Sequence, residues 1–140
     1  MHDAPGGQTG DNIDDSYGYP WLFESESSQQ LFCNIWRKIA DYYKNEPVIL
    51  GYELINEPIA PYFADMEELN AKLEPLHKRA VKAIREVDNN NFILIGGSQW
   101  NGNFKPFKDA RYDDKLMYTC HRYGGEPTKA AIQEIINFRD

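Results

Sequence analysis

The stretch VILGYELINEP, residues 48–58, decides the fold. Its apolar run is typical of a buried parallel strand, and the run ends abruptly in Asn56, Glu57 and Pro58. Pro58 cannot supply the N–H of the next ladder position, so we expect the strand to stop near that residue. A carboxylate at the carboxyl end of a buried parallel strand lies where α/β enzymes place their chemistry. Glu57 is therefore the first candidate catalytic residue.

The rest of the chain alternates between helical and strand patterns. Two further apolar runs, FILIGG at 92–97 and LMYTC at 116–120, predict buried strands. Apolar residues at helical spacing predict three helices, at residues 28–44, 65–88 and about 127–138. A long loop rich in Gly, Asp and Asn precedes them at residues 3–23. Such alternation predicts an α/β fold with parallel strands joined by right-handed crossovers.

Two α/β architectures fit this alternation. A doubly wound nucleotide-binding sheet would place a Gly-rich turn between a strand and a helix. The Gly-rich segment here, residues 6–10, leads instead into a polar loop, and its acidic neighbours Asp11, Asp14 and Asp15 would repel phosphate. The other architecture is a (β/α)8 barrel, in which the carboxyl ends of all strands face one common mouth. We favour the barrel and keep the nucleotide-binding sheet as an alternative.

Polar and aromatic side chains follow each predicted strand, as a barrel mouth requires. Asn56 and Glu57 end the first, Trp100 follows the second, and His121 and Tyr123 follow the third. His2, near the start of the chain, would belong to a fourth strand end. A lone histidine is more often structural, but two of the three histidines fall at such ends. The third, His77, lies mid-helix and is expected on the surface.

Three motifs in this order resemble glycoside hydrolase family 5, the cellulase-like family of retaining (β/α)8 hydrolases. HDAPGGQTGDN at 2–12 is similar to the family's segment after its third strand. LINEP at 54–58 is similar to its fourth-strand motif, and His121-Arg122-Tyr123 resembles the His-x-Tyr that ends its sixth strand. Asn-Glu-Pro alone would occur by chance in roughly a few per cent of chains this long. The combination in the right order is what carries the resemblance.

The resemblance implies a role for each of these residues. Glu57 would be the general acid/base, Asn56 would hold the substrate's 2-hydroxyl, and Trp100 would form a subsite wall. The remaining contacts to carboxylates and hydroxyls would come from His2, His121 and Tyr123. The family's nucleophilic Glu lies on a seventh strand, and a full barrel takes about 250 residues. We therefore expect residues 1–140 to be a fragment of one (β/α)8 catalytic domain, inactive alone, from an enzyme that hydrolyses β-linked glucans or related polysaccharides.

Composition excludes several other classes of protein. The net charge is −7, so an acidic surface argues against nucleic acid and anionic lipid as partners. No apolar run approaches the roughly 20 residues of a membrane span. The family resemblance implies a secreted or periplasmic parent, although residues 1–20 are polar and show no secretory signal. Half a barrel would expose strand edges and an apolar interior, so the isolated fragment is expected to self-associate.

Three weaker signals leave alternatives. Asp11, Asp14 and Asp15 suggest Ca²⁺, but their spacing is not that of an EF-hand, and a solvated loop is favoured. The chain has no Cys-x-x-Cys and no histidine pair at i, i+4 spacing, so we expect no metal and no cofactor. Cys33 and Cys120 are expected as buried free thiols. A non-catalytic carbohydrate-binding remnant of a barrel is the alternative outside the enzyme class.

Overall fold

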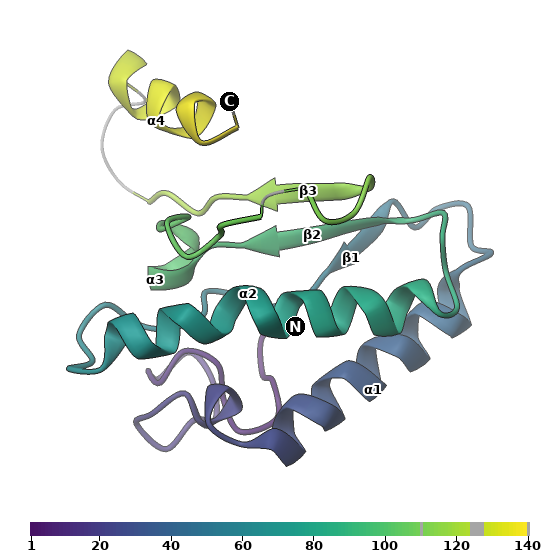
Figure 1. The fold of residues 1–140 in the computed structure, drawn as a ribbon, viewed down its shortest axis with the longest axis horizontal. Helices are drawn as coiled ribbons and strands as arrows, with labels where there is room; N and C mark the ends of the chain where they lie inside the picture. The colour runs from purple at the N-terminus through teal and green to yellow at the C-terminus, as the bar shows by residue number, and fades with distance from the viewer. Residues whose placement is uncertain (110, 124–127, 140) are drawn as a thin grey trace.

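The computed structural model describes residues 1–109, 111–123 and 128–139, and it confirms the predicted alternation (Figure 1). A 3₁₀ turn, η1, precedes a first helix, a strand and a second helix. The second strand ends in a four-residue turn, and the third strand and last helix follow. The elements are η1 (Trp21–Phe23), α1 (Glu26–Tyr43), β1 (Gly51–Glu53), α2 (Met66–Arg85), β2 (Phe92–Gly96), α3 (Ser98–Asn101), β3 (Leu116–Thr119) and α4 (Lys129–Arg139).

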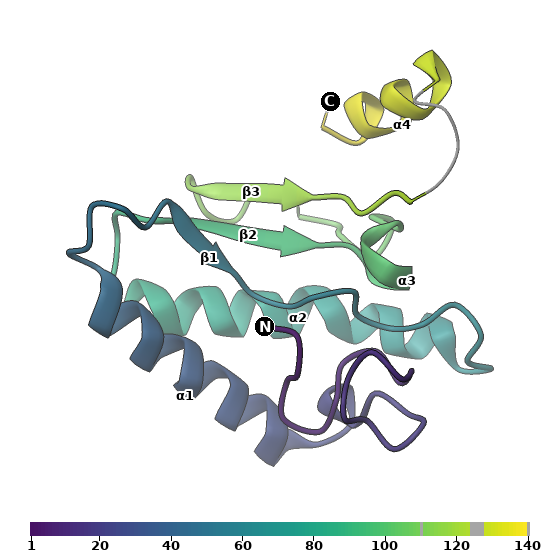
Figure 2. The same cartoon turned by 180° about the vertical axis from the view of Figure 1, so that it is seen from behind.

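The three strands form one parallel sheet in the order β1-β2-β3, with α1 and α2 packed on one face (Figures 1 and 2). Tyr52, Ile93 and Leu116 form one row of partners across the sheet, and Tyr52 and Ile93 are buried beneath the helices. Strands β2 and β3 are each one residue shorter than the apolar runs that predicted them, whereas β1 covers only Gly51–Glu53 of the run that begins at Val48. Their carboxyl ends lie together at one edge of the sheet, as the parallel arrangement requires.

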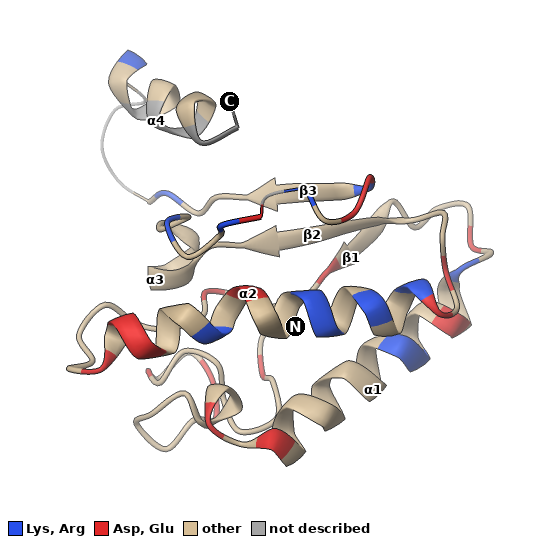
Figure 3. Cartoon of the chain, in the orientation of Figure 1, with Lys and Arg blue, Asp and Glu red and all other residues tan. Residues whose placement is uncertain are grey.

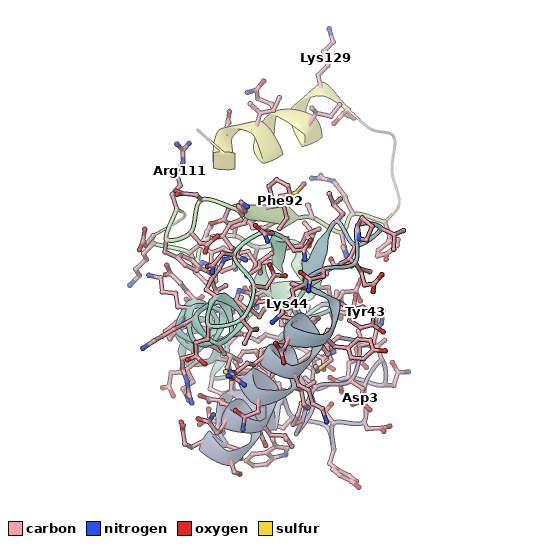
Figure 4. The ribbon with its side chains drawn as sticks, turned by 90° about the vertical axis from the view of Figure 1, so that its right-hand side faces the viewer. Asp3, Tyr43, Lys44, Phe92, Arg111 and Lys129 are labelled. Carbon is pink, nitrogen blue, oxygen red and sulfur yellow. The ribbon has the colours of Figure 1, made fainter. Side chains whose placement is uncertain are left out.

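The opposite face of the sheet is open to solvent in this chain. Glu53, Leu94 and Met117 form a row across it, and Met117 is 41% exposed. Phe92, also exposed, lies on the side of the sheet away from α1 and α2 (Figure 4). An apolar face of this kind favours self-association, which stays a prediction for the isolated chain.

Helix α1 begins at Glu26, two residues before the predicted range 28–44. Ser25 is the N-cap, and its hydroxyl accepts from the Ser28 N–H at 3.2 Å. This bond satisfies one of the N–H groups that the first turn of a helix leaves without a partner. On the buried side of α1, the Trp36 indole N–H donates to the Leu54 carbonyl at 3.1 Å. This bond ties the helix to the end of β1, and Trp36 is part of the buried core.

Helix α2 runs unbroken through Pro75, within the predicted range 65–88. Acidic residues gather in its first turn and basic residues in its last, Glu67 and Glu68 against Lys82 and Arg85 (Figure 3). This distribution complements the helix dipole. Arg85 also forms a bidentate ion pair with Asp113, at 2.8 and 2.9 Å, which fixes the helix end to the loop before β3.

The expectation that His77 lies on the surface is wrong. Its ring is fully buried in α2, stacks on Phe107 at 5.7 Å between centroids, and has no hydrogen-bond partner among the described residues. Burial lowers its pKa to about 3, so the ring is neutral at ordinary pH. The two thiols are free as expected, although Cys33 is buried and Cys120 only partly so. Among the described residues no helix has the length and apolar character needed to cross a bilayer.

Candidate active site

The chain leaves β1 through a turn that contains two left-handed residues. Glu57 has φ 48° and Ile59 has φ 56°, and neither is glycine. A left-handed residue other than glycine costs about 1–2 kcal/mol, and a β-branched residue such as Ile59 adopts this conformation rarely. Strain of this kind persists only where surrounding contacts enforce it, and it is concentrated at functional sites. Pro58, between the two, is buried, but β1 already ends at Glu53, five residues before the proline that was expected to stop it.

The carboxylate of Glu57 meets the imidazole of His121. His121 Nδ1 lies 2.8 Å from Glu57 Oε1, and the two side chains are 22% and 15% exposed. This distance is that of a charge-assisted hydrogen bond. One proton between the two atoms satisfies either partner, as Nδ1–H donating to a carboxylate or as a carboxylic acid donating to a neutral ring. The sequence placed these residues at two strand ends 64 positions apart, and the fold brings them into contact.

The other predicted site residues lie around this pair. Tyr123 packs edge-on against the His121 ring at 6.2 Å between centroids and is 84% exposed. The Asn56 N–H donates to the Met1 carbonyl at 2.9 Å, and the Met1 amine donates to the Glu53 carbonyl at 3.1 Å. These two bonds hold Met1 against the segment that follows β1, near the carboxyl end of that strand (Figure 2), and the exposed His2 comes next in the chain.

A second left-handed turn follows β2. Gln99, Trp100 and Asn101 in α3 have φ of 48°, 59° and 61°. Trp100 is 38% exposed at this turn, as a subsite wall would be. The His121 N–H donates to the Asn101 carbonyl at 3.3 Å, so α3 also supports the residue that contacts Glu57. The Asn101 side chain is buried against Gly96, and its Oδ1 has no partner among the described residues.

The comparisons with known proteins agree with this geometry. The family model for cellulase, glycosyl hydrolase family 5, matches residues 12–137. The chain belongs to glycosyl hydrolase family 5. Two related proteins are Endoglucanase C of Acetivibrio thermocellus, 34% identical over 125 residues, and the Endoglycoceramidase of Hydra vulgaris, 32% identical over 152 residues. The matches cover 88% and 80% of this chain but only 33% and 29% of the relatives, so the chain spans about a third of their length.

A solved family 5 structure has the same arrangement of strands and helices. The chain superposes on Thermotoga maritima Cel5A, solved in complex with cellobiose, with a TM-score of 0.59 and 25% identity. The match covers 86% of this chain and 41% of Cel5A. The three parallel strands and their helices are therefore part of a (β/α)8 barrel, which confirms the predicted fold class.

Two residues that hold the Glu57 turn in this family 5 chain were not predicted from the sequence. Gln8 and Thr9 are fully buried in the loop 3–23, and both donate hydrogen bonds to backbone carbonyls around Glu57. Their only signal in the sequence is a pair of polar residues in a glycine-rich loop, which is ordinary for a solvated segment. Nothing in the pattern indicates that the pair packs against a strand end 48 positions away.

The acidic cluster of the same loop has a structural role. Asp14 Oδ2 accepts from the backbone N–H groups of Gln8 at 2.8 Å and Thr9 at 2.6 Å, and its Oδ1 accepts from Ser16 at 2.9 Å. The Asp14 carboxylate thus organises the loop around itself, while Asp11 accepts from Asn12. Across the part of the chain that the structure describes, no group of three or more His, Cys, Asp or Glu side chains is arranged to hold a metal ion.

Proposed function

We propose that the chain supplies the general acid/base, Glu57, of a retaining glycoside hydrolase that cleaves β-linked glucans. The observation that carries the proposal is the contact between Glu57 and His121, which follow β1 and β3 at the carboxyl edge of a family 5 barrel sheet. The pair is partly exposed, so a ligand can reach it. Tyr123 packs against the His121 ring, and Trp100 belongs to the turn whose Asn101 carbonyl bonds to the His121 N–H. Both are exposed and offer flat surfaces of the kind on which sugar rings stack.

The chemistry assigned to this chain is proton transfer. In the first step Glu57 gives a proton to the glycosidic oxygen as the bond to the anomeric carbon breaks, and in the second it takes one from the attacking water. The hydrogen bond to His121 orients the carboxyl group in both protonation states. Asn56, beside it, is proposed to hold the substrate's 2-hydroxyl, and His2 to bind a hydroxyl farther along the cleft.

A double displacement also needs a nucleophilic carboxylate about 5–5.5 Å from the acid/base. We place that nucleophile outside residues 1–140, in the remainder of the barrel. Purified residues 1–140 should then release no phenol from an aryl β-cellobioside. Turnover by this chain that disappears in Glu57→Gln would contradict the placement of the nucleophile, because it would mean that the chain holds both carboxylates.

The relatives guide the choice of substrate. One is named an endoglucanase, and a solved neighbour holds cellobiose, which favours β-linked glucose units. Another is named an endoglycoceramidase, so glycosides with a lipid tail are the second substrate class to assay. Specificity among these rests on the subsites at either side of the scissile bond, of which Trp100 and Tyr123 would form one part.

The test uses the natural full-length protein that contains this chain and two aryl β-cellobiosides. Phenol is a poor leaving group that requires protonation, whereas 2,4-dinitrophenol leaves without it. Glu57→Gln should lower kcat/KM for the phenyl substrate by about 10²–10⁴-fold and spare the dinitrophenyl substrate. Glu68→Gln, an exposed carboxylate in the first turn of α2, is the control and should change neither. Equal losses on both substrates in Glu57→Gln would contradict the acid/base assignment.

A further inference from the structure

We propose that Gln8 and Thr9 are positioning residues, which set the direction of the Glu57 carboxyl group by holding its backbone in the left-handed turn. The inference rests on the proposed function of Glu57 and adds two residues to it. Neither residue is placed to touch substrate, because both side chains are fully buried and bonded to backbone. They would act only through the residue that they hold.

Gln8 and Thr9 form a clamp on the Glu57 turn. Thr9 and the backbone of Gln8 hold the turn through three hydrogen bonds. The Thr9 hydroxyl donates to the Glu57 carbonyl at 3.0 Å. The Ile59 N–H donates to the Gln8 carbonyl and the Ala60 N–H to the Thr9 carbonyl, both at 2.9 Å. The backbone is therefore fixed immediately before and after Pro58. Both left-handed residues, Glu57 and Ile59, fall within this bonded stretch.

The Gln8 side chain joins the turn to the neighbouring chain segment. Its Nε2 donates to the His2 carbonyl at 2.8 Å and to the Asn56 carbonyl at 3.1 Å. Its Oε1 accepts from the Ala4 N–H at 2.9 Å. One amide thus spans the segment that carries His2 and the segment that carries Glu57. A buried amide with these bonds made has one low-energy orientation, so it fixes the spacing of the two segments.

The two clamp residues, Gln8 and Thr9, are themselves held in place by Asp14. Asp14 accepts from the backbone N–H groups of both residues, at 2.8 and 2.6 Å, so the loop presents the two side chains as a rigid unit. This rigidity matters because a left-handed glutamate relaxes toward ordinary backbone angles when its supports are removed. Relaxation would turn its Cα–Cβ bond and carry Oε1 away from His121, which lies 2.8 Å from it. A misplacement of about 1 Å can reduce a catalysed rate by about 100-fold.

The test compares Thr9→Val with Thr9→Ser in the natural full-length protein that contains this chain. Valine keeps the shape and removes the hydroxyl, and serine keeps the hydroxyl. The readout is the ratio of kcat/KM for phenyl β-cellobioside to that for 2,4-dinitrophenyl β-cellobioside. This ratio does not depend on how much of the protein is folded, because active-enzyme concentration cancels. Thr9→Ala, measured by the same ratio, replaces the valine variant should that protein not accumulate.

Thr9→Val should lower the ratio by about 10-fold, since only the phenyl substrate needs a well-placed proton donor, and Thr9→Ser should leave it within about 2-fold. Gln8→Glu, which keeps the acceptor and removes both donors, should lower it as well. An unchanged ratio in Thr9→Val and Thr9→Ala, with Glu57→Gln showing the full loss, would overturn the positioning role alone. A ratio unchanged even in Glu57→Gln would overturn the proposed function on which it rests.

Discussion

Two turns leave neighbouring strands of the sheet in the same unusual conformation but are supported differently. The turn after β1 contains left-handed Glu57 and Ile59, and the turn after β2 contains left-handed Gln99, Trp100 and Asn101. The first is held by Gln8 and Thr9, 48 positions earlier in the chain. The second is closed by its own residues, because Ser98 and Asn103 exchange two backbone hydrogen bonds at 2.9 Å.

The difference shows which turn depends on the rest of the fold. A locally closed turn keeps its shape wherever the strand before it is formed, so Trp100 and Asn101 are presented by a nearly autonomous loop. The Glu57 turn exists only when the loop 3–23 is folded against it. Its conformation, and with it the direction of the Glu57 carboxylate, therefore depends on tertiary contacts. Of the two turns, it is the one more easily disturbed by substitutions elsewhere in the chain.

The largest expected effect is at Gly7, which precedes the clamp. It has φ 74°, and a Cβ there would lie 2.2 Å from Ser16 Cβ and 2.7 Å from Ser16 Cα. Gly7→Ala should cost about 3 kcal/mol, from the left-handed penalty and from displacement of the loop. Gly18→Ala is the matched control, with φ 75° and no atom within 4 Å, and should cost about 1 kcal/mol. Urea denaturation of the two variants measures the difference, and equal losses would mean that the clamp loop tolerates movement.

The sequence predicted the strand ends and not the shapes of the turns that follow them. Asn56, Glu57, Trp100, His121 and Tyr123 could be placed because apolar runs end at them, and parallel strands bring such ends to one edge. The left-handed angles could not be predicted, since a β-branched residue such as Ile59 argues against them. They result from contacts with a loop whose composition resembles any solvated segment.

The prediction that His77 lies on the surface was wrong for a related reason. Its position in α2 follows from helical periodicity, but whether that side of the helix is covered depends on the segment after β2, which brings Phe107 over the ring. A histidine is more often exposed or partly exposed than fully buried, so the base rate favoured the surface. Because this buried ring is neutral and packs under the segment that follows the second turn, the stability of that packing should depend on pH.

Acid should weaken the packing under the second turn. The pKa of His77 is about 3 in the folded chain against 6.5 when exposed, so between these values the unfolded chain binds a proton that the folded chain does not. Stability therefore falls as pH decreases below 6.5, by about 1.4 kcal/mol per unit, or about 2 kcal/mol at pH 5. Hydrogen bonds hold the pKa values of Glu74, Asp88 and Asp113 below their ordinary range although burial opposes them, so their losses begin at lower pH.

Urea denaturation at pH 7 and pH 5 measures this loss, and His77→Leu isolates its source. Leucine fills a similar volume and does not titrate, so the variant should lose little stability between the two pH values. A variant that loses as much as the wild-type chain would assign the effect to another group. On going from pH 7 to pH 5, protection from hydrogen exchange should fall more around Phe107 than around the Glu57 turn. The clamp residues Gln8 and Thr9 carry no charge that could titrate.

The smallest expected effect concerns the contact between α2 and the second turn. Asn70 is buried, and its Oδ1 accepts from Gln99 Nε2 at 2.9 Å. Because the turn also closes through its own backbone, Asn70→Ala should cost only about 1 kcal/mol. The control is Gln30→Ala, which breaks an exposed amide pair with Asn34 at 3.0 Å and should cost a few tenths of a kcal/mol at most.

Asn70→Ala should also leave the ratio of activities on phenyl and dinitrophenyl β-cellobioside unchanged, because Gln99 does not support Glu57. Thermal denaturation measures the loss of stability in Asn70→Ala, and assays with the two substrates measure the ratio of kcat/KM values. A ratio that falls as far as in Thr9→Val would show that the second turn aims the Glu57 carboxylate through Asn101 and His121, whose backbones are joined by a 3.3 Å hydrogen bond. The two turns would then be equivalent supports of one site, and the contrast between distant and local closure would not extend to catalysis.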